Sequence, residues 1–171
     1  MKRFITILLF ACVALCAAAQ DGMLEKIIAA NTFDSVQASF SQVRHSSLMT
    51  DDLKSEGKVW LQTPDKVRWE VTAPFSKVTV FNGDIPSGRR FRMPSAKDFD
   101  ATVLNGDVVT VNLVPRRSDL GRMFRQIVLT LDPETLLIKT AMLINPDGDW
   151  TSLTFRDIVR GVEIDDKLFE K

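Results

Sequence analysis

The chain has 171 residues, with 22 Lys and Arg against 22 Asp and Glu, one histidine, two cysteines and no tyrosine. This length fits a single domain, and hydrophobic residues at 45% with charged residues at 26% exclude a disordered or collagen-like chain. The zero net charge argues against nucleic acid as a partner, because binding to a phosphate backbone usually needs a basic surface.

The start of the chain has the order of a secretory signal peptide. Lys2 and Arg3 supply positive charge, and the apolar run that follows them ends in alanines. This order predicts export with cleavage after Ala19. The apolar run is short for a membrane-spanning helix, which needs about 20 residues. We therefore expect a signal peptide over 1–19 and one exported, soluble domain over 20–171.

Both cysteines, Cys12 and Cys16, lie inside this signal, so the exported domain has none. It therefore has no disulfide and no cysteine metal site, and burial must supply its stability. The alternative is lipid modification of one cysteine, which would anchor the chain to a membrane. Bulky Phe10 and Leu15 before the two cysteines fit a lipidation site poorly.

The first predicted element of the exported domain is a short amphipathic helix. Leu24, Ile27 and Ile28 recur at helical spacing, and the pattern ends near Asn31. The hydrophobic period then changes to two. In the segment 36–43, apolar residues alternate with Gln and Ser, which is typical of a half-buried strand.

Further strand-like segments follow, separated by turns that contain Pro, Asn, Gly or Asp. They cover 58–62, 67–72, 77–81, 108–114, 127–131, 137–144 and 151–155. Successive strands with short polar turns predict an antiparallel meander that curls into a barrel or a sandwich.

Two segments interrupt this pattern. Residues 85–105 show little period of either kind, and 118–126 could include a helical turn through Leu120, Met123 and Phe124. We interpret both either as surface connections or as a rim that covers part of the sheet. The arginines near them form a solvated rim, or else meet an acidic partner or lipid headgroups: Arg89, Arg90, Arg92, Arg116 and Arg117.

The sequence lacks the usual signs of catalysis. His45 follows a strand beside a polar loop, and neither a serine nucleophile motif nor a phosphate-binding loop is present. The segment 147–149 is typical of a hairpin turn rather than of a calcium loop. We therefore expect neither an enzyme nor a metal or other cofactor. An exported hydrolase that uses His45 and aspartates is the least favoured alternative.

Two groups of residues occur in an order that is specific when the groups are taken together. The first contains Phe40, Gln42, Ser55, Gly57, Trp60, Pro64, Arg68, Trp69 and Pro74. The second covers 113–116, 124–132, 148–151, 155–158 and 164–169. Together they resemble the LolA family, the periplasmic carriers that take lipoproteins towards the outer membrane of Gram-negative bacteria.

The resemblance implies a mainly β (α+β) fold: a strongly curved, incomplete antiparallel barrel with a few short helices over its mouth and an apolar cavity inside. It implies a periplasmic carrier whose cavity receives the acyl chains of lipoproteins. An inner-membrane donor complex and an outer-membrane acceptor would be its further partners, and we expect a monomer. Two departures stand out, because Thr63 occupies the position of a family arginine and the segment after Gly83 is abbreviated.

Alternation along the strands predicts which residues face inward and bind lipid: Phe40, Leu61, Trp69, Val71, Val80, Leu113, Leu129 and Phe155. Met93, Met123 and Phe124 are further lipid contacts on the lid segments, and Leu24 and Ile27 belong to the N-terminal helix. The alternative is that these residues fill an ordinary barrel core. A membrane-anchored lipid-binding or envelope-sensing module of the same fold is the second functional hypothesis.

Overall fold

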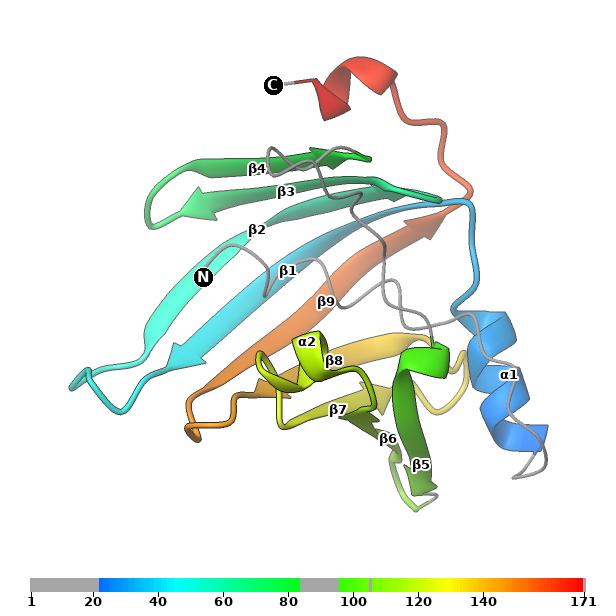
Figure 1. Cartoon of the computed structure of the whole chain (residues 1–171). Helices are drawn as coiled ribbons and strands as arrows, with labels where there is room; N and C mark the ends of the chain where they lie inside the picture. The colour runs from blue at the N-terminus through cyan, green and yellow to red at the C-terminus, as the bar shows by residue number, and fades with distance from the viewer. Residues whose placement is uncertain (1–21, 84–95, 105, 171) are drawn as a thin grey trace.

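One antiparallel sheet of nine strands forms the centre of the molecule (Figure 1). The computed structural model describes residues 22–83, 96–104 and 106–170. The strands are β1 (Ser35–His45), β2 (Leu53–Gln62), β3 (Lys66–Ala73), β4 (Lys77–Asn82), β5 (Phe99–Leu104), β6 (Val109–Pro115), β7 (Gln126–Leu131), β8 (Ile138–Ile144) and β9 (Trp150–Arg160).

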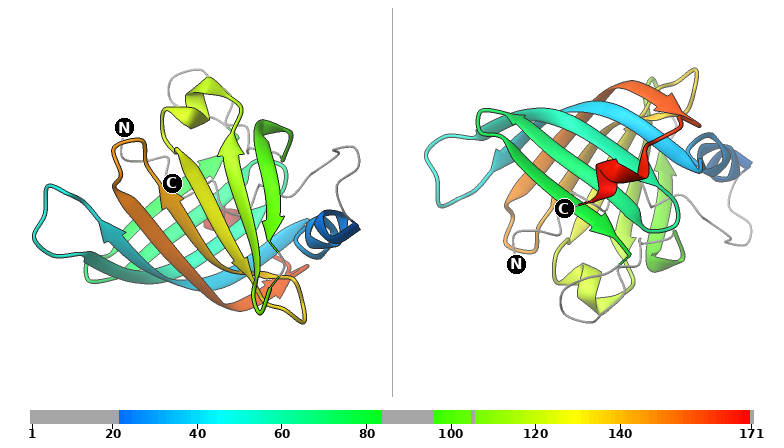
Figure 2. Two further views of the ribbon diagram at one scale, coloured as in Figure 1. Left: turned by 90° about the horizontal axis from the view of Figure 1, so that it is seen from below. Right: turned by 90° about the horizontal axis from the view of Figure 1, so that it is seen from above.

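The sheet is open. Its spatial order is β4-β3-β2-β1-β9-β8-β7-β6-β5, so β4 and β5 form its two edges and do not pair with each other. Figure 2 shows how strongly the sheet curves between these edges. The mainly β class and the curved, incomplete antiparallel barrel are therefore confirmed.

The described helices are short: α1 (Gly22–Ala30), α2 (Ser118–Gly121) and the 3-10 helices η1 (Ala96–Asp98) and η2 (Asp166–Phe169). α1 and the helical turn at α2 agree with the predictions. α1 lies at one end of the curved sheet, and the β1–β2, β3–β4 and β8–β9 turns lie at the other end (Figures 1 and 2).

The predicted strand segments match β1–β4 and β6–β9, whereas β5 was not predicted. In β5 the alternation of Phe99, Ala101 and Val103 is only six residues long and follows a segment without a period. The predicted signal peptide, both cysteines, Met93 and the arginines 89, 90 and 92 lie outside the described residues.

The strand register assigns every side chain to one of two faces, because directly paired residues of antiparallel strands share a face. Phe40 pairs with both Gly57 and Phe155, and Val59 pairs with Trp69. These residues belong to the inner face, where one apolar cluster extends in the order of the sheet from β3 to β5. Trp60, which pairs with Gln37 and Arg68, belongs to the outer face.

The inner face depends on a close approach of β2 and β3 at Gly57. A Cβ atom at this position would lie 1.9 Å from the carbonyl oxygen of Glu70 and 2.7 Å from Cζ of Phe40. The Phe40 ring therefore covers the glycine, and it stacks on Trp69 with 4.0 Å between the ring centroids. Beside it, Gln42 donates a hydrogen bond to the Ser55 hydroxyl at 3.2 Å.

The C-terminal segment packs on the outer face of β3 and β4. Arg68 donates to the Leu168 carbonyl at 3.1 Å and pairs with Glu70 at 2.8 Å. Lys66 contacts Asp166 at 2.6 Å, and Phe169 is buried. Arg68, the arginine of the sequence motif, thus holds the end of the chain against the outer face of the sheet and does not lie on the inner face.

We predict that Gly57→Ala lowers the free energy of unfolding by about 1–3 kcal/mol or more, because the added methyl group meets backbone that cannot move freely. Urea denaturation followed by circular dichroism measures the change. Gly121→Ala is the matched control, because a Cβ at that position has no neighbour within 4 Å. Equal stability of the two variants would contradict the role of the close approach.

Candidate functional site

The inner wall of the sheet brings together most of the residues predicted to bind lipid. Phe40, Leu61, Trp69, Leu113, Leu129, Phe155, Phe124 and Ile27 are 0–5% exposed and belong to one apolar cluster. Val71 and Met123 are half-buried and pack against this cluster. On α1 the half-buried residues that pack against it are Met23 and Ile28, and Leu24 is half-buried beside them.

The predicted inward orientation of Val80 is wrong. Val80 pairs with Arg68 and therefore lies on the outer face, near the C-terminal segment. The inner-face residue of β4 is Phe81, which pairs with Val67 and packs against the apolar cluster. Because Val78, Val80 and Phe81 are all apolar, alternation along β4 alone does not identify the inner face.

Several wall residues were not among the predicted contacts, although the same alternation marks them. They are Val36, Ala38, Val59 and Val67 in the first strands, and Val109, Val111, Ile127, Leu131, Leu143 and Leu153 in the later ones. The prediction, which chose one or two residues per strand, therefore underestimated the extent of the apolar inner wall. This wall runs across every strand of the sheet.

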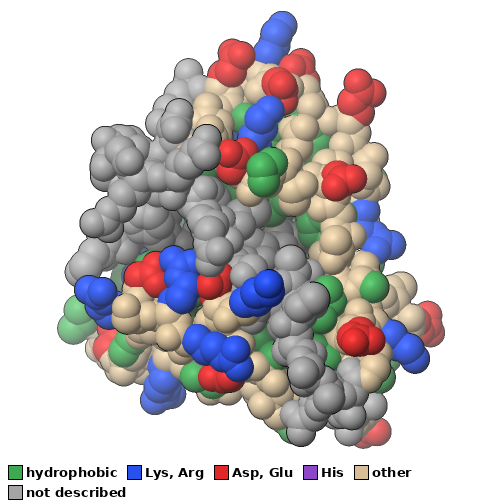
Figure 3. Space-filling model, turned by 45° about the vertical axis from the view of Figure 1, so that its right-hand side comes forward, with side chains coloured by type: hydrophobic (Ala, Val, Ile, Leu, Met, Phe, Trp, Pro, Cys, Tyr) green, Lys and Arg blue, Asp and Glu red, His purple; other side chains and the backbone are tan. Residues whose placement is uncertain are grey.

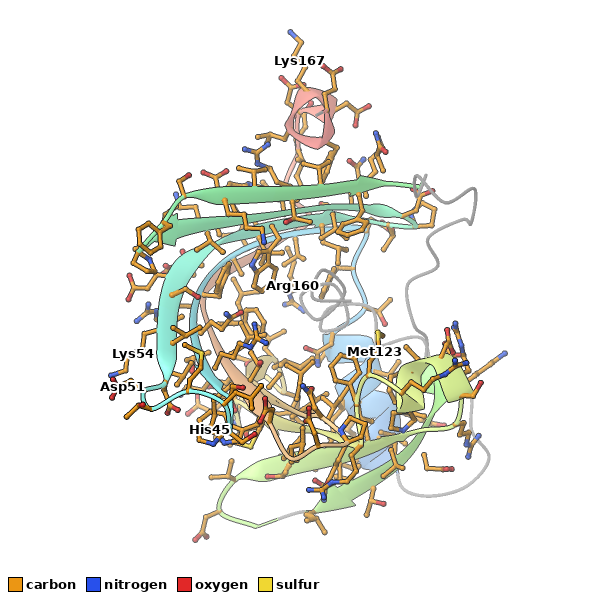
Figure 4. All side chains as sticks on the ribbon, turned by 60° about the vertical axis from the view of Figure 1, so that its left-hand side comes forward. His45, Asp51, Lys54, Met123, Arg160 and Lys167 are labelled. Atoms are coloured by element: carbon orange, nitrogen blue, oxygen red, sulfur yellow. The ribbon has the colours of Figure 1, made fainter. Side chains whose placement is uncertain are left out.

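The wall becomes polar towards the turn end of the sheet. Beyond Phe40, the inner-face positions of β1 are Gln42 and Arg44, and their β9 partners are Leu153 and Thr151. At the opposite end, a bulge at Asp157, whose φ is 53°, shifts the phase of β9. Arg160 consequently pairs with Val36 on the inner face, and Figure 4 shows it on the concave side.

Arg160 holds the C-terminal end of α1. Its guanidinium donates a hydrogen bond to the Ala30 carbonyl at 2.7 Å. The last carbonyls of a helix lack partners within the helix and carry partial negative charge, so a cation is favourable at this position. The contact joins the helix to the end of β9.

Asn31 joins the same end of α1 to β8. Its side-chain amide donates to the Leu136 carbonyl at 2.7 Å, and its side-chain oxygen accepts from the Ile138 amide at 3.0 Å. Pairing of β8 with β9 stops at Thr140, so Asn31 supplies hydrogen bonds where the neighbouring strand no longer does. The Asn31 residue is only 4% exposed. This end of α1 is therefore firmly attached to the sheet.

A pocket of about 260 Å³ lies where β8 and β9 diverge, between Ile138 and Ile158, with Phe155 in its lining. This volume is slightly below the roughly 300–1,000 Å³ that is usual for small-molecule sites. Lys139 and Arg156 also line it. The pocket by itself does not accommodate a long acyl chain.

The described arginines of the predicted rim are paired with carboxylates. Arg116 donates to Asp100 at 2.7 Å, and Arg117 binds Asp119 and approaches Asp98 at 3.6 Å. The hydrogen bond from Arg117 lowers the pKa of Asp119. Figure 3 likewise shows a face on which basic and acidic side chains lie beside each other rather than in a patch of one sign. A solvated, ion-paired rim explains Arg116 and Arg117 better than an anion site does.

Thr63, at the end of β2, takes a structural role. Its amide and its hydroxyl both bind the Asp34 carbonyl, at 2.8 and 3.2 Å, and so connect β2 to the segment between α1 and β1. The predicted turn at 147–149 is confirmed, because the Asn145 amide binds the Asp149 carbonyl across it. Within the described ranges, no group of three metal-ligating side chains occurs and no helix is long and apolar enough to cross a membrane.

Comparison with known proteins agrees with this architecture. Residues 31–85 match the family model described as "Outer membrane lipoprotein carrier protein LolA". An outer-membrane lipoprotein carrier protein of Methylococcus capsulatus is 25% identical over 162 residues, which cover 79% of this chain and 76% of that protein. The chain is therefore similar to the LolA family.

One of the solved structures that resemble this chain supports its fold. A chain of the Pseudomonas aeruginosa MucA/MucB complex superposes with a TM-score of 0.52 at 16% identity, over 86% of this chain and 59% of that one. This LolA-like chain thus spans less than two thirds of that structure. The LolA superfamily protein NE2245 of Nitrosomonas europaea gives a TM-score of 0.44 at 11% identity, over 81% and 90% of the two chains. The matching family is one of carriers, and no catalytic family is indicated.

We predict that Asn31→Ala lowers the free energy of unfolding by about 1–3 kcal/mol for each buried backbone group that loses its partner. The loss should be accompanied by faster hydrogen exchange of the Ile138 amide, measured by NMR. Asn82→Ala is the control, because among the described residues its exposed side chain makes one long hydrogen bond, of 3.4 Å, to the Phe169 carbonyl. Unchanged exchange at Ile138 would contradict the attachment of α1 to β8.

Proposed function

We propose that this protein is a periplasmic carrier that binds the acyl chains of lipoproteins against the inner wall of the sheet and moves them from the inner to the outer membrane. The observation that carries the proposal is the one-sided apolar wall of an open sheet, from Val67 in β3 to Val111 in β6. The match to lipoprotein carriers supports the same assignment.

Physical chemistry explains why such a wall suits such a cargo. Each CH₂ group transferred from water to an apolar surface contributes about 0.8 kcal/mol, so an exposed acyl chain is strongly unfavourable in water. Apolar contact is non-directional, so a broad apolar wall can bind acyl chains of different length without a pocket shaped for one of them. The half-buried thioether of Met123 adds an adaptable surface near α2.

The wall residues are nearly fully buried, so cargo binding requires a rearrangement of what lies over them. α1 is the best described candidate for this movement. Its C-terminal end is attached through Asn31 and Arg160, whereas apolar side chains such as Ile27 provide its other contacts with the wall. We propose that α1 turns about its attached end and exposes the wall to the cargo.

The remaining parts of the proposal concern export. Residues 1–19 would act as the signal peptide, and 20–171 would form a single carrier domain in the periplasm. An inner-membrane donor complex and an outer-membrane acceptor would deliver and receive the cargo. The match to a family of carriers supports a binding function.

The alternative is a membrane-anchored lipid-binding or envelope-sensing module. Its support is the likeness to a chain of the MucA/MucB complex, which is itself an assembly of two proteins. Labelling producing cells with a radioactive fatty acid separates the two functions. An anchored module would incorporate label at Cys12 or Cys16, whereas the carrier would not.

We predict that Val71→Glu abolishes the release of lipoproteins from inner-membrane vesicles, because it places a charge on the half-buried part of the inner wall. Val128→Glu is the matched control. Val128 is also a half-buried valine within a strand, but it pairs with Asn112 and Met142 on the outer face. Release should persist with the control. Equal release with both variants, with the fold of each confirmed by circular dichroism, would contradict the inner wall as the cargo site.

A further inference from the structure

Two large apolar side chains are almost fully exposed on the turns of this sheet. Leu48 in the β1–β2 turn is 93% exposed, and Phe75 in the β3–β4 turn is 83% exposed. Met49 lies beside Leu48 and is also exposed. We call Leu48, Met49 and Phe75 the apolar turn tips. Large apolar side chains this exposed gain free energy when they enter an apolar phase.

The apolar turn tips lie at the same end of the molecule. Both views in Figure 2 place the β1–β2 and β3–β4 turns together at the end opposite α1, as does Figure 1. The β8–β9 turn also lies there, and Trp150 begins β9 directly after it. The turns that carry these apolar residues therefore lie at one end of the sheet.

The β1–β2 turn is held in place rather than free. The Asp149 carboxylate accepts hydrogen bonds from the Ser47 amide at 2.8 Å and from the Ser46 hydroxyl at 2.7 Å. His45 stacks on Trp150 with 5.5 Å between the ring centroids and binds Asp52 at 2.8 Å. Contacts with the β8–β9 turn thus hold the turn that carries Leu48 in place. The exposure of Leu48 therefore follows from the folded structure.

We propose that the apolar turn tips enter the surface of a lipid bilayer, so that the protein contacts membranes directly through this end. The inference concerns a partner surface and holds whether or not the inner wall carries acyl chains. We infer a lipid partner because the apolar turn tips lie on separate turns that protrude from the sheet. Protruding side chains of this kind insert more readily into a fluid apolar phase than into a shaped protein groove. Aromatic rings such as Trp150 behind them are typical of the membrane interface.

The charges at this end predict which lipids are favoured. Acidic and basic side chains are mixed there: Asp51, Asp52, Asp147 and Asp149 lie at the same end as Arg44, Lys54, Lys77 and Arg125, and Figure 4 labels Asp51 and Lys54. Anionic lipid should therefore not increase binding. Attachment should instead depend on apolar insertion, which salt screens little.

Sedimentation with vesicles of phosphatidylethanolamine and phosphatidylcholine, without any lipoprotein, tests the proposal. The wild-type chain should bind, and the binding should persist at high salt. Leu48→Ser combined with Phe75→Ser should weaken it by at least about tenfold, since each buried large side chain accounts for more than that factor. Leu104→Ser combined with Val159→Ser is the matched control, because these residues are 53% and 51% exposed on other parts of the sheet. The control should bind like the wild type.

A fluorescent label gives a second readout. Residues 22–171 contain no cysteine, so Phe75→Cys, in a background with Cys12→Ala and Cys16→Ala, carries one environment-sensitive dye. Its emission should shift to shorter wavelength on vesicles, while a dye at Val159→Cys should not respond. No binding by the wild type, equal binding by both double variants, or binding that needs anionic lipid and disappears in salt would overturn the proposal. A shift of the Phe75→Cys dye only in vesicles that contain membrane proteins would also overturn it.

Discussion

The backbones of β2 and β3 approach each other so closely at Gly57 that no side chain fits between them, and the rest of the wall depends on this constraint. The Phe40 ring covers the glycine and stacks on Trp69, which joins β1, β2 and β3 into one continuous apolar surface. Because side chains alternate between the two faces of a strand, Trp60 and Arg68, which neighbour inner-face residues, lie on the outer face. There Arg68 holds the C-terminal segment.

The residues that carry the family resemblance are mostly those that build the sheet. Phe40, Gly57 and Trp69 form the central contact, Gln42 bonds to Ser55, and Arg68 binds the end of the chain. The sequence resemblance to the family is therefore evidence mainly for the fold. In the proposed function, cargo binding would depend on the composition of the wall, to which every strand contributes, and on the proposed movement of α1.

Alternation predicted the strands because one face of each strand is buried and the other is not. It failed where that condition does not hold. In β4 the valines lie on the outer face under the C-terminal segment, so Val80 was assigned to the wrong side. In β9 the bulge at Asp157 reverses which residues face inward. The local sequence pattern does not predict this change, and so it does not predict the hydrogen bond from Arg160 to Ala30. Asn31 likewise pairs with residues more than a hundred positions away, and only the folded chain brings them together.

Trp60 and Trp69 provide the most direct test of the central claim that acyl chains lie against the inner wall. They sit on neighbouring strands but on opposite faces of the same sheet, since Trp69 pairs with Val59 and Trp60 pairs with Arg68. Two variants that each keep one of these tryptophans, with the other and Trp150 changed to Phe, would be titrated with a spin-labelled fatty acid. The account predicts saturable fluorescence quenching of Trp69 and little quenching of Trp60. Equal quenching of both, or none of Trp69, would contradict it.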